Sequence, residues 1–203
     1  MPRGSSSPIS RLLKTVRAAF SFRHLEDFRD AGWYETERLF REAQEAGVNY
    51  LDIATAYHEA GHAVVARYLG VPVKSLKIDP SGGIVKLDNV IPESRRTGST
   101  KLLQLGIAGE VAEQIKFGDW NRHGVSDDRR KFHSLVQYLA GLRGRVLPGS
   151  TVASVREYHR EQCLEILSQP EVWEWLEAVA ESALERGSLT GEEIDRLRPT
   201  RGE

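Results

Sequence analysis

Apolar residues recur every three or four positions along most of the chain, which is the spacing of helices that bury one face. The longest clear run covers residues 51–69, and Gly70 followed by Pro72 marks its end. The same pattern predicts further helices over residues 35–46, 99–117, 126–142, 151–167 and 170–186, with a short one after Thr190. The chain is therefore expected to be mainly helical.

One stretch departs from the helical spacing. Residues 73–79 alternate between apolar and polar side chains, as a half-buried strand does. A Pro-Ser-Gly-Gly turn follows, and residues 84–87 suit the returning strand of a hairpin. We therefore expect a mainly α fold with a small β-hairpin or sheet beside the helix at 51–69.

Several side chains are placed to begin these helices. Ser99 and Ser126 can cap the N-termini of the helices that follow them. Pro170 suits the first turn of a helix, and Thr190 with Glu193 forms a capping box for the last one.

The segment His58-Glu59-Ala60-Gly61-His62 matches the pattern H-E-x-x-H inside the helix predicted at 51–69. Residues four apart share one helix face, so both imidazoles can bind one Zn²⁺. Glu59 lies beside them and can accept a proton from a metal-bound water, whose pKa the metal lowers towards about 7. Gly61 is unusual inside a helix and predicts a close approach of another backbone or of the substrate. The motif predicts a zinc site that hydrolyses peptide bonds.

A catalytic zinc site needs a third protein ligand and one open position. The spacing leaves five downstream candidates open, namely Asp119, His123, Asp127, Asp128 and His133. If Ser126 caps a helix, Asp127 and Asp128 occupy its first turn, where acids also serve simply to complement the helix dipole. The residues alone do not decide among the five.

Composition narrows the class of protein. The 203 residues carry a formal net charge of −1, which argues against a dedicated nucleic-acid binder, and the short basic run Arg129-Arg130-Lys131 is interpreted as a solvated helix face. The single cysteine, Cys163, excludes an internal disulfide framework, suits a reducing compartment and is expected to be a buried thiol. No apolar run approaches the roughly 20 residues that span a bilayer, so no transmembrane span is expected.

The N-terminus differs from the rest of the chain. Its first 25 residues hold five basic side chains and no acidic one. Such a segment is a transit peptide, an amphipathic helix over residues 9–22 that contacts a membrane surface, or a solvated and disordered leader. We divide the chain into a basic leader at 1–30 and a catalytic domain at 31–203. The expected location is the cytoplasm, or an organelle interior if the leader is a transit peptide.

Four segments resemble the peptidase domain of the FtsH-type metallopeptidases, in the same order and at similar spacing. They are the zinc-motif helix at 56–63, the small-residue helix at 107–118 that ends in Phe-Gly, the Gly-Val-Ser-Asp-Asp segment at 124–128, and the terminal helix pair at 184–194. The resemblance covers residues 54–197, and its segments together are much more specific than the zinc motif alone.

The resemblance implies a mostly α peptidase domain that binds Zn²⁺. His58 and His62 take the positions of the zinc-binding histidines, and Glu59 takes that of the catalytic glutamate. Asp128 takes the position of the third ligand, while Asp127 stands where the family has Asn. The strand at 74–79 resembles the family's edge strand beside the cleft, to which a substrate peptide can add as another strand.

The resemblance also shows what differs here. Members of the family usually carry a membrane anchor and an AAA+ ATPase before the peptidase, and their peptidase domains form hexameric rings. This sequence contains no G-x-x-x-x-G-K-[ST] loop, and residues 119–123 replace the family's short connection. We expect a zinc metalloendopeptidase that cleaves unfolded or loosely folded polypeptides without its own ATPase, with a homo-hexamer implied. The alternative is a peptidase-like module or adaptor that docks on a separate ATPase or partner.

A second resemblance is set aside. Residues 45–57 resemble the aldo-keto reductases, in which an Asp and a Tyr five positions apart serve catalysis, as Asp52 and Tyr57 are spaced here. That fold is a full barrel of about 250 residues, for which this chain is too short and too helical. Asp52 is therefore interpreted as an acid at a helix start, and Tyr57 as a packed aromatic.

Overall fold

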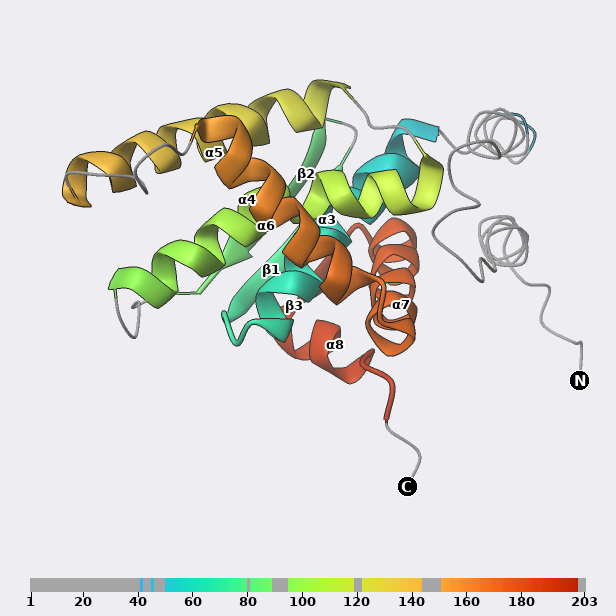
Figure 1. The fold of residues 1–203 in the computed structure, drawn as a ribbon. Helices are drawn as coiled ribbons and strands as arrows, with labels where there is room; N and C mark the ends of the chain where they lie inside the picture. The colour runs from blue at the N-terminus through green and yellow to red at the C-terminus, as the bar shows by residue number, and fades with distance from the viewer. Residues whose placement is uncertain are drawn as a thin grey trace, which may run out of the picture.

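The computed structural model describes residues 41, 45, 50–79, 81–88, 95–118, 122–143 and 151–200. The leader at 1–30, its amphipathic helix at 9–22 and most of the helix predicted at 35–46 lie outside the described residues; Arg41 and Glu45 are helical. The elements follow one another as α3 (Tyr50–Tyr68), β1 (Val73–Asp79), β2 (Gly82–Leu87), α4 (Arg95–Phe117), α5 (Arg122–Arg143), α6 (Val152–Leu167), α7 (Pro170–Arg186), β3 (Ser188–Thr190) and α8 (Gly191–Arg196). The prediction of a mainly α fold with one small sheet is confirmed (Figure 1).

Helix α3 is the central element of the fold. Helices α4 and α7 pack against it, as do strands β1 and β2 (Figure 1). Its apolar residues between Ile53 and Ala66 are almost completely buried. Asp52 lies in its first turn and Tyr57 is 1% exposed, so both interpretations of these residues are confirmed. A helix buried on several sides holds its side chains in fixed positions, which suits it to carry a site.

The approach of α4 to α3 depends on Gly61. A Cβ atom at this position would lie 2.7 Å from the Ala108 carbonyl oxygen and 2.7 Å from the Ala112 Cβ. The close backbone approach predicted for Gly61 is therefore confirmed, and the partner is helix α4. A buried ion pair fixes α4 to α7 as well, because Lys116 Nζ lies 2.7 Å from Glu177 Oε1.

The sheet contains three antiparallel strands in the order β2-β1-β3. Strand β1 is therefore the central strand, and the expectation that residues 74–79 form an edge strand is wrong. The reason lies beyond α7, where Gly187 adopts φ 74° and ends the helix, so that Ser188–Thr190 can pair with β1. The strand that stays at the edge on the other side is β2.

Two predicted helix starts also need correction. Helix α4 begins at Arg95 rather than after Ser99, since Gly98 costs only about 1 kcal/mol inside a helix and does not prevent the earlier start. Helix α5 likewise begins earlier than predicted, at Arg122. The later starts are confirmed: Pro170 occupies the first turn of α7, and Thr190 and Glu193 form a capping box on α8.

Two further findings concern single features. Cys163 is fully buried in α6, and burial raises the pKa of its thiol to about 12, which confirms the expected inert thiol. Within the described part of the chain, no helix combines the length and apolar composition needed to cross a bilayer.

Candidate metal centre

The two histidines of the H-E-x-x-H motif lie one turn apart on α3. Their Nε2 atoms are 3.0 Å apart, and His58 is only 5% exposed. The i, i+4 spacing on a helix turns both imidazoles to the same side, as the sequence predicts. Because α3 is packed between α4, α7 and the sheet, this pair is held on a largely buried helix.

Asp128 reaches this pair from α5. Its Oδ2 atom lies 2.8 Å from His58 Nε2 and 2.9 Å from His62 Nε2. Helix α5 begins at Arg122, so the prediction that Ser126 caps the helix is wrong, and Asp128 lies in the second turn instead of the first. Gly124 costs only about 1 kcal/mol inside a helix and does not prevent this earlier start. Asp128 therefore does not merely complement the helix dipole; it faces two imidazoles.

The other candidates for a third ligand do not join this cluster. Asp127 points to solvent and pairs with Arg130. His133 is exposed and contacts Gln137 at 2.8 Å. Asp119 and the side chain of His123 lie outside the described residues. Among the residues described, the group able to hold a metal ion consists of His58, His62 and Asp128.

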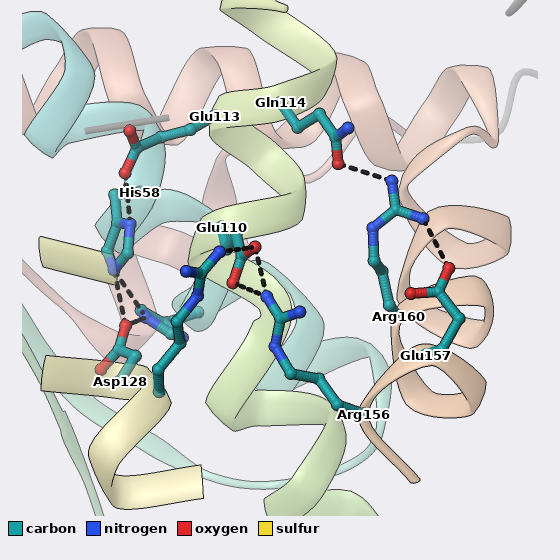
Figure 2. A network of polar contacts seen from close by, with 10 residues as sticks. His58, Glu110, Glu113, Gln114, Asp128, Arg156, Glu157 and Arg160 are labelled. Carbon is teal, nitrogen blue, oxygen red and sulfur yellow. Dashed lines mark hydrogen bonds and ion pairs between the residues drawn. The ribbon is translucent and has the colours of Figure 1, made fainter. Parts of the chain in front are cut away.

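Each imidazole also has a partner on its other nitrogen. His58 Nδ1 lies 2.5 Å from Glu113 Oε1 (Figure 2). His62 Nδ1 lies 2.7 Å from the Leu105 carbonyl oxygen. A carbonyl oxygen can only accept, so His62 Nδ1–H donates and its Nε2 is left with a lone pair. Metal-binding histidines are typically oriented by such a contact from behind. The motif itself carries no sign of Glu113 or Leu105, because both come from α4, more than 40 residues further along the chain.

The convergence of these atoms fits a divalent cation. Ligands about 2.1 Å from a tetrahedral zinc lie about 3.4 Å from one another, and the three atoms here converge slightly more closely than that. With Nδ1 as the donor, lone pairs of both imidazoles and of the carboxylate face one another across a small space. Such an arrangement is stable only with a proton or a cation between them.

The pKa values of these groups show the same choice between a proton and a cation at the site. Burial lowers the pKa of His58, but hydrogen bonds to Asp128 and Glu113 outweigh burial and raise this pKa to about 10. Burial also raises the pKa of Asp128, yet its contacts with His58 and His62 hold that pKa well below its usual range. Without a metal, the pair therefore retains a proton that a metal must displace.

Glu59 lies next to these atoms at a cleft of about 210 Å³. The cleft is lined by Glu59, His62 and Asp128, together with strand β2 at Gly83, Ile84 and Val85. Burial raises the pKa of Glu59, although the nearby imidazoles oppose this shift. A carboxylate with a raised pKa at the wall of a cleft is suited to accept a proton.

Two glycines make room for these side chains. A Cβ atom at Gly109 on α4 would lie 2.6 Å from His58 Nε2. A Cβ atom at Gly83 on β2 would collide with the side chain of Glu59. Both positions tie the backbone of a neighbouring element to one functional side chain, and the motif alone points to neither.

Comparison with known proteins supports the resemblance to zinc metallopeptidases. The chain matches no protein-family model. It is 32% identical over 127 residues to the ATP-dependent zinc metalloprotease YME1L of Drosophila melanogaster, covering 59% of this chain and 17% of that protein. It is 30% identical over 173 residues to the ATP-dependent zinc metalloprotease FTSH 9, chloroplastic/mitochondrial, of rice (Oryza sativa subsp. japonica), covering 71% of this chain and 22% of that protein.

A bacterial protein matches in the same way. The ATP-dependent zinc metalloprotease FtsH of Pelobacter propionicus is 31% identical over 130 residues, 60% of this chain and 20% of that protein. The chain thus spans about a fifth of the length of the curated relatives it matches. These matches agree with the resemblance found in the sequence, and the chain carries a domain of the FtsH-type zinc metalloprotease family.

Proposed function

We propose that this chain is a zinc-dependent endopeptidase that hydrolyses peptide bonds of unfolded or loosely folded proteins. The observation that carries the proposal is the meeting of His58 Nε2, His62 Nε2 and Asp128 Oδ2 within 3.0 Å of one another, beside Glu59 and an open cleft. Three nitrogen and oxygen ligands next to open space are typical of a catalytic zinc site, whereas structural sites usually have four protein ligands.

His58, His62 and Asp128 would hold the ion. When bound, zinc supplies a water that ionises near neutral pH and a Lewis acid that polarises a carbonyl group. Glu113 and the Leu105 carbonyl oxygen keep the two imidazoles oriented and their Nε2 lone pairs directed inward.

Glu59 would move the proton. Its carboxylate accepts a proton from the attacking water while the water oxygen bonds to the peptide carbonyl carbon. It then gives this proton to the leaving amine as the C–N bond breaks, so that the products are one carboxylic acid and one amine, between which the remaining proton passes to give a carboxylate and an ammonium group. Burial beside the cleft, which raises the pKa of Glu59, suits a group that must both accept and release a proton near neutral pH.

Strand β2 would position the substrate. It is an edge strand of the sheet and lines the cleft next to Glu59. An extended peptide can add to such an edge through main-chain hydrogen bonds, which requires an unfolded segment and tolerates many side chains. We propose the edge of β2 for the role that the sequence assigned to residues 74–79.

The test compares zinc content and casein cleavage in four forms of the full chain, with and without ATP. We expect the wild type to bind zinc and to cleave casein without ATP. Glu59→Gln should keep the metal and lose activity by about 10²–10⁴-fold, since the proton acceptor is gone. Asp128→Ala should lose the metal, while the matched control Asp127→Ala, at the exposed neighbouring position, should keep both metal and activity.

Each outcome bears on the proposal. Unchanged cleavage by Glu59→Gln would overturn the mechanism, and full zinc occupancy in Asp128→Ala would overturn the ligand set. Zinc binding without any cleavage would instead favour a peptidase-like module or adaptor that acts with a separate ATPase.

A further inference from the structure

We infer that Glu110, Arg129 and Arg156 form a clamp that positions Asp128 for metal binding. The inference rests on the metal site proposed above and adds residues that lie outside it. Glu110 comes from α4, Arg129 from α5 and Arg156 from α6. The clamp thus joins the three helices behind the third ligand.

Glu110 is the centre of the clamp. Its side chain is 4% exposed, and it accepts hydrogen bonds from Arg129 Nη2 at 3.2 Å and from Arg156 Nη2 at both carboxylate oxygens. A buried carboxylate is costly unless charged donors surround it, so this position of Glu110 requires its two arginines. Planar guanidinium groups also fix direction, because their donors have a rigid geometry.

Arg129 transmits this constraint to Asp128, its neighbour in the chain. Helix α5 packs chiefly against α4; its buried apolar side chains are Phe132 and Val136, and its other described side chains are exposed or half-buried. A helix that buries few apolar side chains is held only weakly in place. The bond from Arg129 to Glu110 restrains the turn that carries Asp128.

Helix α4 thereby serves both halves of the site. Glu110 faces Arg156, and Glu113, one turn further on, faces His58 (Figure 2). One face of α4 thus fixes an imidazole on α3 and, through Arg129, the carboxylate on α5. The distance between Asp128 and the histidines is set from one common helix, and a metal site tolerates errors of only about 0.5 Å.

The fold provides matched controls. Arg160 on α6 donates to Gln114 Oε1 on α4 at 2.6 Å and lies 3.1 Å from Glu157, so it ties α6 to α4 (Figure 2). Arg130 is adjacent to Arg129 but pairs with the exposed Asp127. Removing either arginine changes the net charge as Arg129→Gln does, yet leaves Glu110 and its partners in place.

The experiment measures zinc affinity of the full chain by competition with a chromophoric chelator, and the visible spectrum of the cobalt(II) form. Glu110→Gln and Arg129→Gln should each weaken zinc binding by about 10–100-fold, the usual effect of losing a group that orients a ligand. The cobalt spectrum should change in both, because the geometry at Asp128 changes. The double variant should bind zinc no more weakly than the single variant with the lower affinity, since both substitutions break the same contact between Arg129 and Glu110.

Arg160→Gln and Arg130→Gln should bind zinc like the wild type, and Arg129→Lys should recover part of the affinity. Wild-type affinity and spectrum in a folded Arg129→Gln would overturn the clamp, as would an equal loss in Arg160→Gln. If Glu110→Gln fails to fold, Arg129→Gln still decides, because the Arg129 side chain is 43% exposed. A wild type that binds no zinc would overturn the metal site itself, and the clamp with it.

Discussion

The proposed ligands come from two helices with very different surroundings. Helix α3 is enclosed by α4, α7 and the sheet, and it approaches α4 so closely that Gly61 has no room for a Cβ atom. Helix α5 packs chiefly on α4, and on the same α4 a Cβ at Gly106 would meet Phe132 of α5 at an ordinary 3.5 Å. The histidines thus sit on a rigid element, and Asp128 sits on a peripheral one. The site depends on how firmly the second is fastened to the first.

Among the substitutions, Gly61→Ala should have the largest effect on stability, because it disrupts the close packing of α3 against α4. The added methyl group meets the Ala108 carbonyl oxygen and the Ala112 Cβ, and overpacking of this kind costs about 3 kcal/mol. The melting temperature should fall by about 6–12 °C. The matched Gly106→Ala should be neutral or slightly stabilising. Equal melting temperatures for the two variants would show that α3 and α4 are not packed more tightly than α4 and α5.

Hydrogen exchange should reveal that α5 is held less firmly than α3. In the metal-free protein, amides of α5 should exchange faster than those of α3, since among the described side chains α5 buries fewer apolar ones than α3. At a zinc concentration of about 100 Kd, opening of α5 becomes about 100-fold rarer, because opening withdraws Asp128 from the ion. Peptides from α7 serve as the internal control and should not change. Zinc that slows α3 and leaves α5 unchanged would contradict the role of Asp128.

Gly109→Ala tests whether α4 also limits the rigid half of the site. The added Cβ would lie 2.6 Å from His58 Nε2, so the ring must turn away from Asp128 and from Glu113. Zinc affinity should fall by about 10–100-fold, as for other changes that misorient a ligand. Gly106→Ala, one turn earlier on the same helix, is the control for helix propensity. Unchanged affinity in Gly109→Ala would mean that the ring adapts without loss.

The contrast between α3 and α5 also explains what the sequence could predict. The helix expected at 51–69 is found at Tyr50–Tyr68, because its periodicity, its first acid and its terminal glycine all agree. The pair His58 and His62 follows from helical spacing alone, whereas Asp128 emerged only from the family resemblance. Its own helix was misplaced, since Ser126 has the chemistry of a cap but lies within α5.

Contacts between distant segments explain the remaining errors. Glu113 and Leu105 lie 55 and 43 residues from the histidines they contact, and no local pattern indicates such pairs. Strand β1 became central because the three-residue strand β3 returns to it from beyond α7. A short strand that forms only by pairing leaves no periodic signal of its own.

The pH dependence of the metal-free protein probes the contact between the two helices directly. The pKa of His58 is about 10 in the folded protein and about 6.5 when unfolded. The folded state therefore binds the extra proton between these values, so this stabilisation is complete below about pH 6.5 and is lost as the pH rises towards 10. The slope is at most about 1.4 kcal/mol per pH unit.

Melting temperatures in a chelator should fall between pH 7 and 9.5 more steeply for the wild type than for His58→Gln. The exposed His133→Gln, on α5, should behave like the wild type. Parallel curves for the wild type and His58→Gln would show that no proton is shared between α3 and α5. The expected difference instead identifies the proton that zinc must displace. Zinc affinity should therefore rise over the same pH range.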